Sequence, residues 1–266
     1  MKKMHIIKAI VLLVFATFIF ILHKTGDITR FVNPAYLHFS QIASVLFIVL
    51  FFIQVPRIFE SEKESHDHAF CGPWGCSHDG ADLSFKTFLS YTLICLPLIS
   101  GLLFPLKDLG AAEALKRGIT YSDQEQCTIE DEDQKASFDS RKINELLQAP
   151  VLEFDDQNFS TYFSAIGAYP DLFIGKEIKI EGFITNDSLE AHTILTRFFV
   201  THCVADAHAV GIIIEDGVSL GIERDTWVHL IGVLDVREEA KGESLILKVS
   251  KWEAISPPKT PYIYPK

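Results

Sequence analysis

Three long apolar runs, all within the first 106 residues, constrain the fold of this chain more than any other feature. They cover residues 4–22, 36–55 and 87–106, and the second and third contain no Asp, Glu, Lys or Arg. At a rise of about 1.5 Å per residue, a helix of each length is about long enough to cross the ~30 Å hydrocarbon core of a membrane. Because a backbone in lipid must satisfy its own hydrogen bonds, we expect each run to be an α-helix.

The first run allows a second interpretation, a cleaved signal peptide. Its Met-Lys-Lys start fits that interpretation, but Leu22 is followed by His, Lys, Thr, Gly and Asp, which do not form a small-residue cleavage site. We therefore favour a membrane span. The basic residues near the spans divide six against five between the two sides. This slight excess favours a cytoplasmic N-terminus and an extracytoplasmic C-terminal domain.

Charge divides the chain into two parts. Residues 1–106 contain 8 Lys and Arg against 7 Asp and Glu, whereas residues 107–266 contain 16 against 28. Such asymmetry is typical of a membrane region joined to a solvated domain. We expect a transmembrane region at 1–106 with a His- and Cys-rich loop at 56–86, then an acidic linker at 107–150 and a soluble domain at 151–266.

The soluble domain has the pattern of a small all-β fold with a flanking helix. Residues 158–168 place apolar side chains at helical spacing. Five short strands are then predicted, at 177–184, 194–203, 209–215, 227–236 and 244–252. Their number and order predict a five-stranded barrel of the oligonucleotide/oligosaccharide-binding (OB) type. The expected fold class is therefore a membrane α-helical N-terminal region with about three transmembrane helices, followed by an OB-like barrel, and this analogy alone gives no function.

The acidity of the soluble part argues against a nucleic-acid partner. A protein that binds phosphate backbones needs a basic groove. Here 28 acidic residues outnumber 16 basic ones after residue 106. We expect no nucleic-acid binding.

A first candidate metal site lies in the loop between the second and third apolar runs. Its segment HDHAFCGPWGCSHD carries thiols and imidazoles, which are the ligands that Zn²⁺ and other thiophilic metals prefer. The expected ligands are His66, His68, Cys71, Cys76 and His78. The C-x4-C spacing departs from the C-x2-C of structural zinc sites. Two alternatives remain open: a local disulfide between the two cysteines on an oxidising side of the membrane, or a tether with neither role.

A second candidate metal site lies in the segment TRFFVTHCVADAHAVG, with His202, Cys203, Asp206 and His208 as ligands. On a strand the first two would face opposite sides, and the other two would follow in or after a turn. A packed cysteine beside exposed histidines is a comparable alternative. A nucleophilic Cys–His pair is less favoured, because no glycine elbow or oxyanion hole accompanies it. We therefore assign no catalytic residue and do not expect an enzyme.

The chain as a whole resembles the YcgQ-type family of bacterial membrane proteins. The resemblance is carried by the first two apolar runs and by the phrases GKEIKIEGFI, RFFVTHCVADAHAVGIIIE and DTWVHLIGVL. It is strongest over residues 197–215. It implies a place in a two-component permease, with a separate multi-spanning permease as the partner, and more weakly a link with zinc homeostasis.

These observations predict a multi-pass protein of the bacterial cell membrane that contacts lipid and acts as the accessory subunit of a permease, with zinc as its candidate cofactor. Three helices are too few to build a transport path, and the second and third runs offer no charged residue for an ion or proton relay. The alternative is a membrane-anchored binding or sensing protein whose barrel recognises a head group, a glycan or a peptide. A cysteine hydrolase is a third, less favoured function.

Overall fold

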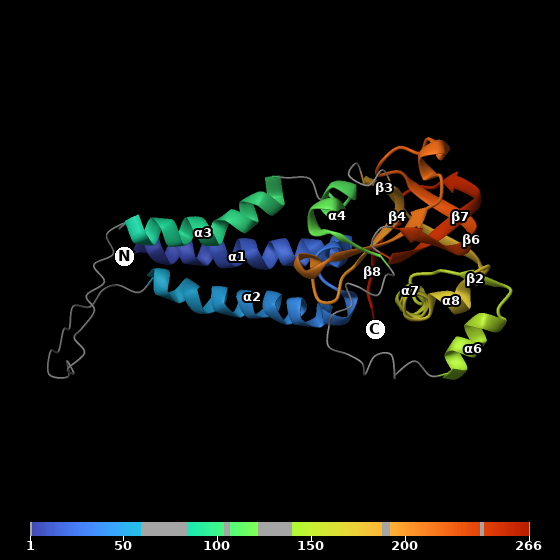
Figure 1. Ribbon diagram of the computed structural model, residues 1–266. Coiled ribbons are helices and arrows are strands. Elements are labelled where there is room, and N and C mark those ends of the chain that lie inside the picture. The colour runs from blue at the N-terminus through green and yellow to red at the C-terminus, as the bar shows by residue number, and fades with distance from the viewer. Residues whose placement is uncertain are drawn as a thin grey trace, which may run out of the picture. The chain divides into compact units, whose positions relative to one another are not determined.

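The computed structural model describes residues 2–59, 85–103, 107–121, 140–187, 192–239 and 242–265. The chain forms two compact units (Figure 1), which we call the helical unit and the β unit. The helical unit contains residues 1–28 and 35–107, and the β unit contains residues 29–34 and 108–266. The short segment 29–34 therefore belongs with the C-terminal residues, although its neighbours in the chain are the first two helices.

The described residues of the helical unit include three apolar helices: α1 (Lys2–Thr25), α2 (Leu37–Phe59) and α3 (Phe85–Leu103). The two apolar helices α1 and α2 are long enough to cross a membrane, whereas the apolar stretch of α3, Leu89–Gly101, is shorter. Many large apolar side chains on all three are exposed, as expected of helices that face lipid. The predicted helices are confirmed, but only two of them qualify as candidate membrane spans.

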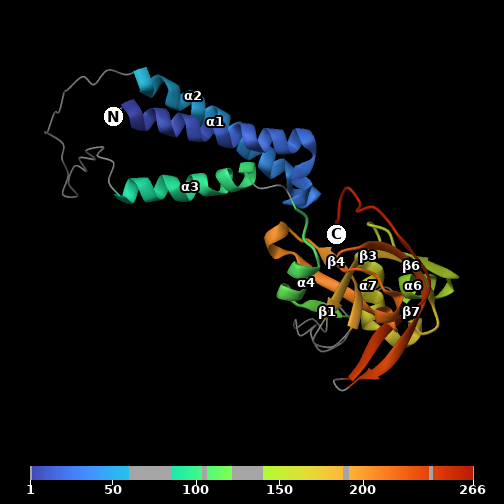
Figure 2. The ribbon, with the colours of Figure 1, turned by 90° about the horizontal axis from the view of Figure 1, so that it is seen from above.

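Polar contacts join α1 to α2, which lie side by side in both views (Figure 1, Figure 2). The hydroxyl of Ser44 donates to the carbonyl of Ala16 at 3.3 Å, and Ala16 itself is buried. Gln54 Nε2 and His5 Nδ1 lie 2.7 Å apart near the other end of the hairpin. Small residues and polar cross-links of this kind are how helices associate in lipid, where no hydrophobic driving force exists between them.

In its described residues, the β unit contains a sheet of eight strands. The strands are β1 (Ile119–Tyr121), β2 (Val151–Glu153), β3 (Glu177–Asp187), β4 (His192–Phe199), β5 (His208–Ile214), β6 (Trp227–Glu239), β7 (Gly242–Ala254) and β8 (Tyr262–Ile263). Their order is β1-β5-β7-β6-β3-β4-β8, with two further pairings, β4 with β5 and β2 with β3. Each of the five long strands, β3 to β7, thus pairs with two others of the same five. These pairings are antiparallel except that between β5 and β7.

Helices cover this sheet. They are α4 (Ala111–Arg117), α6 (Ser140–Gln148), α7 (Phe159–Ala168) and α8 (Pro170–Phe173). One hydrophobic core contains Phe163 of α7 with Phe199 of β4, and a second contains Ala114 of α4 with Phe198 of β4. Because adjacent residues of β4 enter different cores, every residue from Thr193 to Val200 is buried.

The structure agrees with the five predicted strands and the predicted helix at 158–168, and it differs from the prediction at 107–150. That range was expected to be an acidic linker, yet α4, β1 and α6 lie in it, and the β unit begins at Asp108. The reason is packing: Ala111 and Ala114 are fully buried against the sheet. The acidic run itself falls within 122–139, outside the described residues.

Candidate functional site

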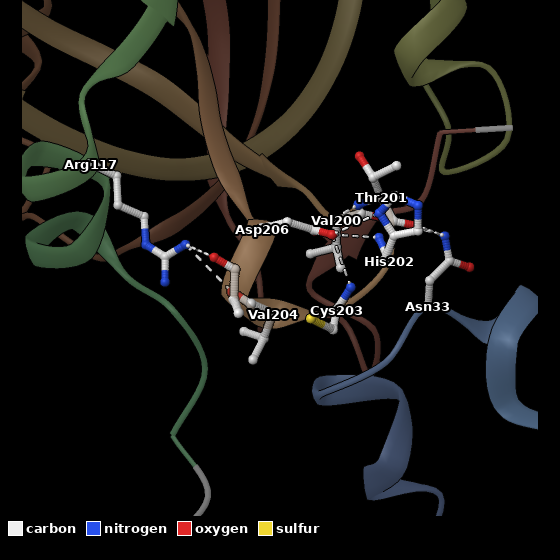
Figure 3. A network of polar contacts seen from close by, with 9 residues as sticks. Asn33, Arg117, Val200, Thr201, His202, Cys203, Val204 and Asp206 are labelled. Atoms are coloured by element: carbon white, nitrogen blue, oxygen red, sulfur yellow. Dashed lines mark hydrogen bonds and ion pairs between the residues drawn. The ribbon is translucent and has the colours of Figure 1, made fainter. Parts of the chain in front are cut away.

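The turn that follows β4, residues 200–207, contains most of the second predicted cluster (Figure 3). β4 ends at Phe199, and a short 3₁₀ helix, η4 (Val204–Asp206), precedes β5. The carboxylate of Asp206 accepts the backbone N–H groups of Thr201 at 3.1 Å, His202 at 2.8 Å and Cys203 at 3.2 Å. The chain therefore turns here because one side chain satisfies three consecutive N–H groups that no longer have strand partners.

The hydrogen bonds also set the charge of Asp206. Partial burial acts to raise the pKa of this carboxyl, but the N–H donors of His202 and Cys203 and the ring of His202, 3.0 Å away, outweigh it. The net result is a pKa below the ordinary value of an aspartate. Asp206 therefore stays ionised to a lower pH than an ordinary aspartate, with both oxygens engaged.

The four residues predicted as metal ligands do not converge. The ring of His208 packs against Phe199, with ring centroids 5.5 Å apart, and burial lowers the pKa of this histidine. His202 is exposed, and Cys203 is a half-buried free thiol. Over the described part of the chain, no three His, Cys, Asp or Glu side chains gather as a metal site would require. Metal binding at 202–208 is therefore not supported.

The first predicted cluster lies outside the described residues. Its members are His66, His68, Cys71, Cys76 and His78. Both the zinc site and the alternative disulfide in this loop stay predictions.

The segment 29–34 lies along the turn after β4 as a short antiparallel bridge. Val32 is the partner of Cys203. On either side of this pair, the N–H of Asn33 donates to the carbonyl before Cys203 at 3.0 Å, and the N–H after Cys203 donates to the carbonyl of Phe31 at 2.8 Å. The bonds flank the pair rather than join it, so Val32 and Cys203 form a non-hydrogen-bonded antiparallel pair.

A buried side chain holds the same bridge (Figure 3). Asn33 is 5% exposed, and its Nδ2 donates to the carbonyl of Thr201 at 2.7 Å and approaches that of Val200 at 3.4 Å. These carbonyls belong to the irregular chain just beyond β4. The amide of Asn33 thus provides hydrogen bonds that the sheet cannot.

Two further segments form hydrogen bonds with the turn after β4 or with segment 29–34. Arg117, at the end of α4, donates through Nη1 to the carbonyl of Ala207 at 2.6 Å. Tyr264, just after β8, donates its hydroxyl to the carbonyl of Thr29 at 2.5 Å, and burial raises the pKa of Tyr264 to about 12, so the hydroxyl stays protonated. Four segments that are distant in sequence therefore meet at the turn after β4. We call this region the junction, and it consists of 29–34, 200–207, Arg117 and 262–264.

A buried arginine beside the junction was not anticipated. Arg197 of β4 is 3% exposed and donates to Asp156 Oδ1 at 3.0 Å. Its guanidinium lies between the rings of Phe159, 5.6 Å from the centroid, and Trp227, 5.1 Å. Burial lowers the pKa of Arg197, and Asp156 opposes that shift. The signal was present in the sequence as the only charged residue in the run TILTRFFV.

These features describe a membrane-anchored protein whose C-terminal β unit incorporates the turn between its first two apolar helices. The chain belongs to the DUF1980 family: the model of the DUF1980 C-terminal domain matches residues 129–265, and that of the N-terminal domain matches residues 7–120. It is 26% identical to UPF0703 protein YcgQ of Bacillus subtilis, over 97% of this chain and 98% of that protein. It is 24% identical to a Streptococcus mutans protein that bears the provisional name of a two-component membrane permease complex subunit, over 91% of this chain and 93% of that protein.

Proposed function

We propose that this chain is the accessory subunit of a two-component membrane permease complex, and that a separate multi-spanning protein forms the transport path. The observation that carries the proposal is the similarity to the Streptococcus mutans protein named as such a subunit, which extends over nearly the full length of both chains. The helices support it, because α2 and the described part of α3 contain no acidic residue within their apolar stretches. An ion or proton path normally requires charged or polar groups inside the membrane, facing a cavity.

In this proposal the five long strands close into an OB-type barrel. The support is their cyclic pairing, β3-β4-β5-β7-β6 and back to β3, with one parallel contact between β5 and β7. Barrels of this type usually bind oligomers over the face that their second and third strands expose. Here the corresponding strands, β4 and β5, are covered by α4, β1 and α7 of the same chain. This coverage favours a role in holding a membrane assembly over recognition of a glycan or nucleic acid on that face.

The test is co-purification from the native membrane. A tagged chain, extracted in mild detergent, should bring down one multi-spanning protein in a fixed ratio, and that protein, tagged in turn, should bring down the chain. The matched control is an unrelated tagged protein with three apolar helices and a similar copy number. A chain that is recovered alone in both directions, while folded and membrane-bound, would overturn the proposal.

A further inference from the structure

The junction ties one end of the membrane hairpin to the β unit. Segment 29–34 is the connection between α1 and α2, yet its bridge to Cys203 and the bond from Tyr264 to Thr29 lie within the β unit. The buried amide of Asn33 also bonds there (Figure 3). A connection held by backbone pairing and a side chain that is 5% exposed is an integral part of the fold. Wherever the α1–α2 connection lies, the β unit lies with it.

This attachment determines whether the number of membrane crossings after α2 is odd or even. If α1 and α2 each cross once, the connection 29–34 lies on one side and Arg57, at the far end of α2, lies on the other. The chain must then return to the first side between Phe59 and Asp108, because Asp108 begins the C-terminal part of the β unit, which also contains 29–34. An odd number of crossings is required in that interval whatever the absolute orientation.

The described helix in that interval is suited to the crossing. α3 has 19 residues, which at about 1.5 Å each extend about 28 Å, close to the ~30 Å of the hydrocarbon core. Its single charged residue, Lys86, stands in its first turn, outside the apolar stretch. Pro97 inside it is tolerated in membrane helices, since neighbouring helices can satisfy the freed carbonyl.

From this geometry we infer that α3 is a third membrane span, and that the β unit shares its side of the membrane with the α1–α2 turn and lies opposite the end of α2. The inference rests on the proposed membrane anchoring and is independent of whether a permease partner exists. It also predicts that any ligand handled by the β unit meets it on the α1–α2 side only.

Sidedness is measured with single cysteines in a full-length chain whose five native cysteines are replaced by serine. The reporters are exposed residues: Lys24→Cys at the α1–α2 end, Lys251→Cys on β7 and Arg57→Cys at the far end of α2. With a membrane-impermeant maleimide on intact cells and on permeabilised cells, the first two should be labelled from one side and the third from the other. Labelling of Lys251→Cys and Arg57→Cys from the same side would overturn the inference, whatever the co-purification gives.

The premise has its own test at the bridge. A non-hydrogen-bonded antiparallel pair has Cα atoms about 4.5 Å apart, within the range of a disulfide. Val32→Cys, in a chain that keeps Cys203 as its only other cysteine, should therefore form an intramolecular disulfide in membranes under a mild oxidant, seen as loss of both sites for a polyethylene glycol maleimide. Phe31→Cys is the control and should stay reduced, because successive side chains of an extended segment alternate in direction. Equal oxidation of the two variants, or of neither, would contradict the attachment.

Discussion

The side-chain amide of Asn33 donates a 2.7 Å hydrogen bond to the carbonyl of Thr201, which is 168 residues away in the sequence. This contact joins the connection between two apolar helices to the end of a buried strand. Its importance follows from the burial of the donor, because the side chain of Asn33 is 5% exposed and its amide has little access to water. The contact also shows why the division between the two family domain models, which lies between residues 120 and 129, is not a structural boundary.

Asn33→Ala should destabilise the β unit by about 1–3 kcal/mol, the usual cost of leaving a buried polar group without its partner. Asn33→Asp should be at least as harmful, because it turns a donor into an acceptor that faces two carbonyl oxygens. Thermal unfolding of the purified full chain in detergent measures both. Asn144→Ala, at an exposed position of α6, is the control and should change the free energy of unfolding by less than about 0.5 kcal/mol. Equal stability of the Asn33 and Asn144 variants would contradict the role of the amide.

Asp206 should make the stability of the junction depend on acid. Its pKa in the folded chain lies below the ordinary value of 3.8, so its contribution is present above that value and is lost as the pH falls through the lower folded pKa. Asp206→Asn keeps one acceptor oxygen and loses the charge. We expect it to be less stable than the parent chain by about 1 kcal/mol at pH 7, with a smaller difference below about pH 4.

Denaturant unfolding at several pH values checks this expectation. Glu253→Gln, an exposed change on β7, is the control for the loss of one carboxylate. A difference between Asp206→Asn and the parent chain that grows on acidification would show that the sign assigned to Asp206 is wrong.

Much of the fold follows from local sequence patterns, and the junction does not. Apolar runs and alternation predict the helices and the five long strands because both depend on residues close in sequence. The strand expected to continue to Cys203 ends at Phe199 instead, since Asp206 draws the following N–H groups into a turn. No local pattern could reveal that this turn is also the partner of residues 29–34, because the contact is set by tertiary packing. The same limit explains why α4, in a stretch expected to be a linker, is part of the domain.

The candidate residues at 202–208 show the same difference between what local sequence predicts and what tertiary packing determines. Sequence reasoning selected them for their ligand chemistry, and the structure gives Asp206 a different task, the capping of backbone N–H groups. The sequence patterns did not single out Arg197, because its significance depends on burial between two aromatic rings that come from separate elements. Spacing along the chain could not supply that information.

Arg197 should tolerate replacement by a neutral side chain of similar volume better than replacement by another cation. Arg197→Lys keeps a charge that must stay buried but removes the planar group that lies between Phe159 and Trp227, so we expect a loss of about 2–4 kcal/mol. Arg197→Met keeps most of the volume and leaves no buried charge, because Asp156 is half exposed and can be solvated. The methionine variant should therefore be the more stable of the two in denaturant unfolding. The control Asp156→Asn should cost less than about 1 kcal/mol, and a lysine variant as stable as the parent chain would refute the stacking argument.

Gly211 tests whether the segment after α3 is built into the sheet. A Cβ at this position of β5 would lie 2.5 Å from Ile194 Cγ2, 3.0 Å from Ile119 Cγ2 and 3.1 Å from the carbonyl oxygen of Leu195. Gly211→Ala should therefore destabilise the β unit by about 1–3 kcal/mol through overpacking. Ile119 belongs to β1, which pairs with β5, so its contact with position 211 depends on that pairing.

A double-mutant cycle isolates that contact. Because Ile119→Ala removes one of the side chains that the new methyl group would meet, Gly211→Ala should be less harmful in the Ile119→Ala background, by at least about 0.5 kcal/mol. Ser256→Ala, an exposed change beyond β7, serves as the background control and should leave the effect of Gly211→Ala unchanged. Strict additivity of the Gly211 and Ile119 changes would mean that β1 does not rest on β5 in solution. The segment after α3 would then be a linker, as its acidic surroundings first suggested.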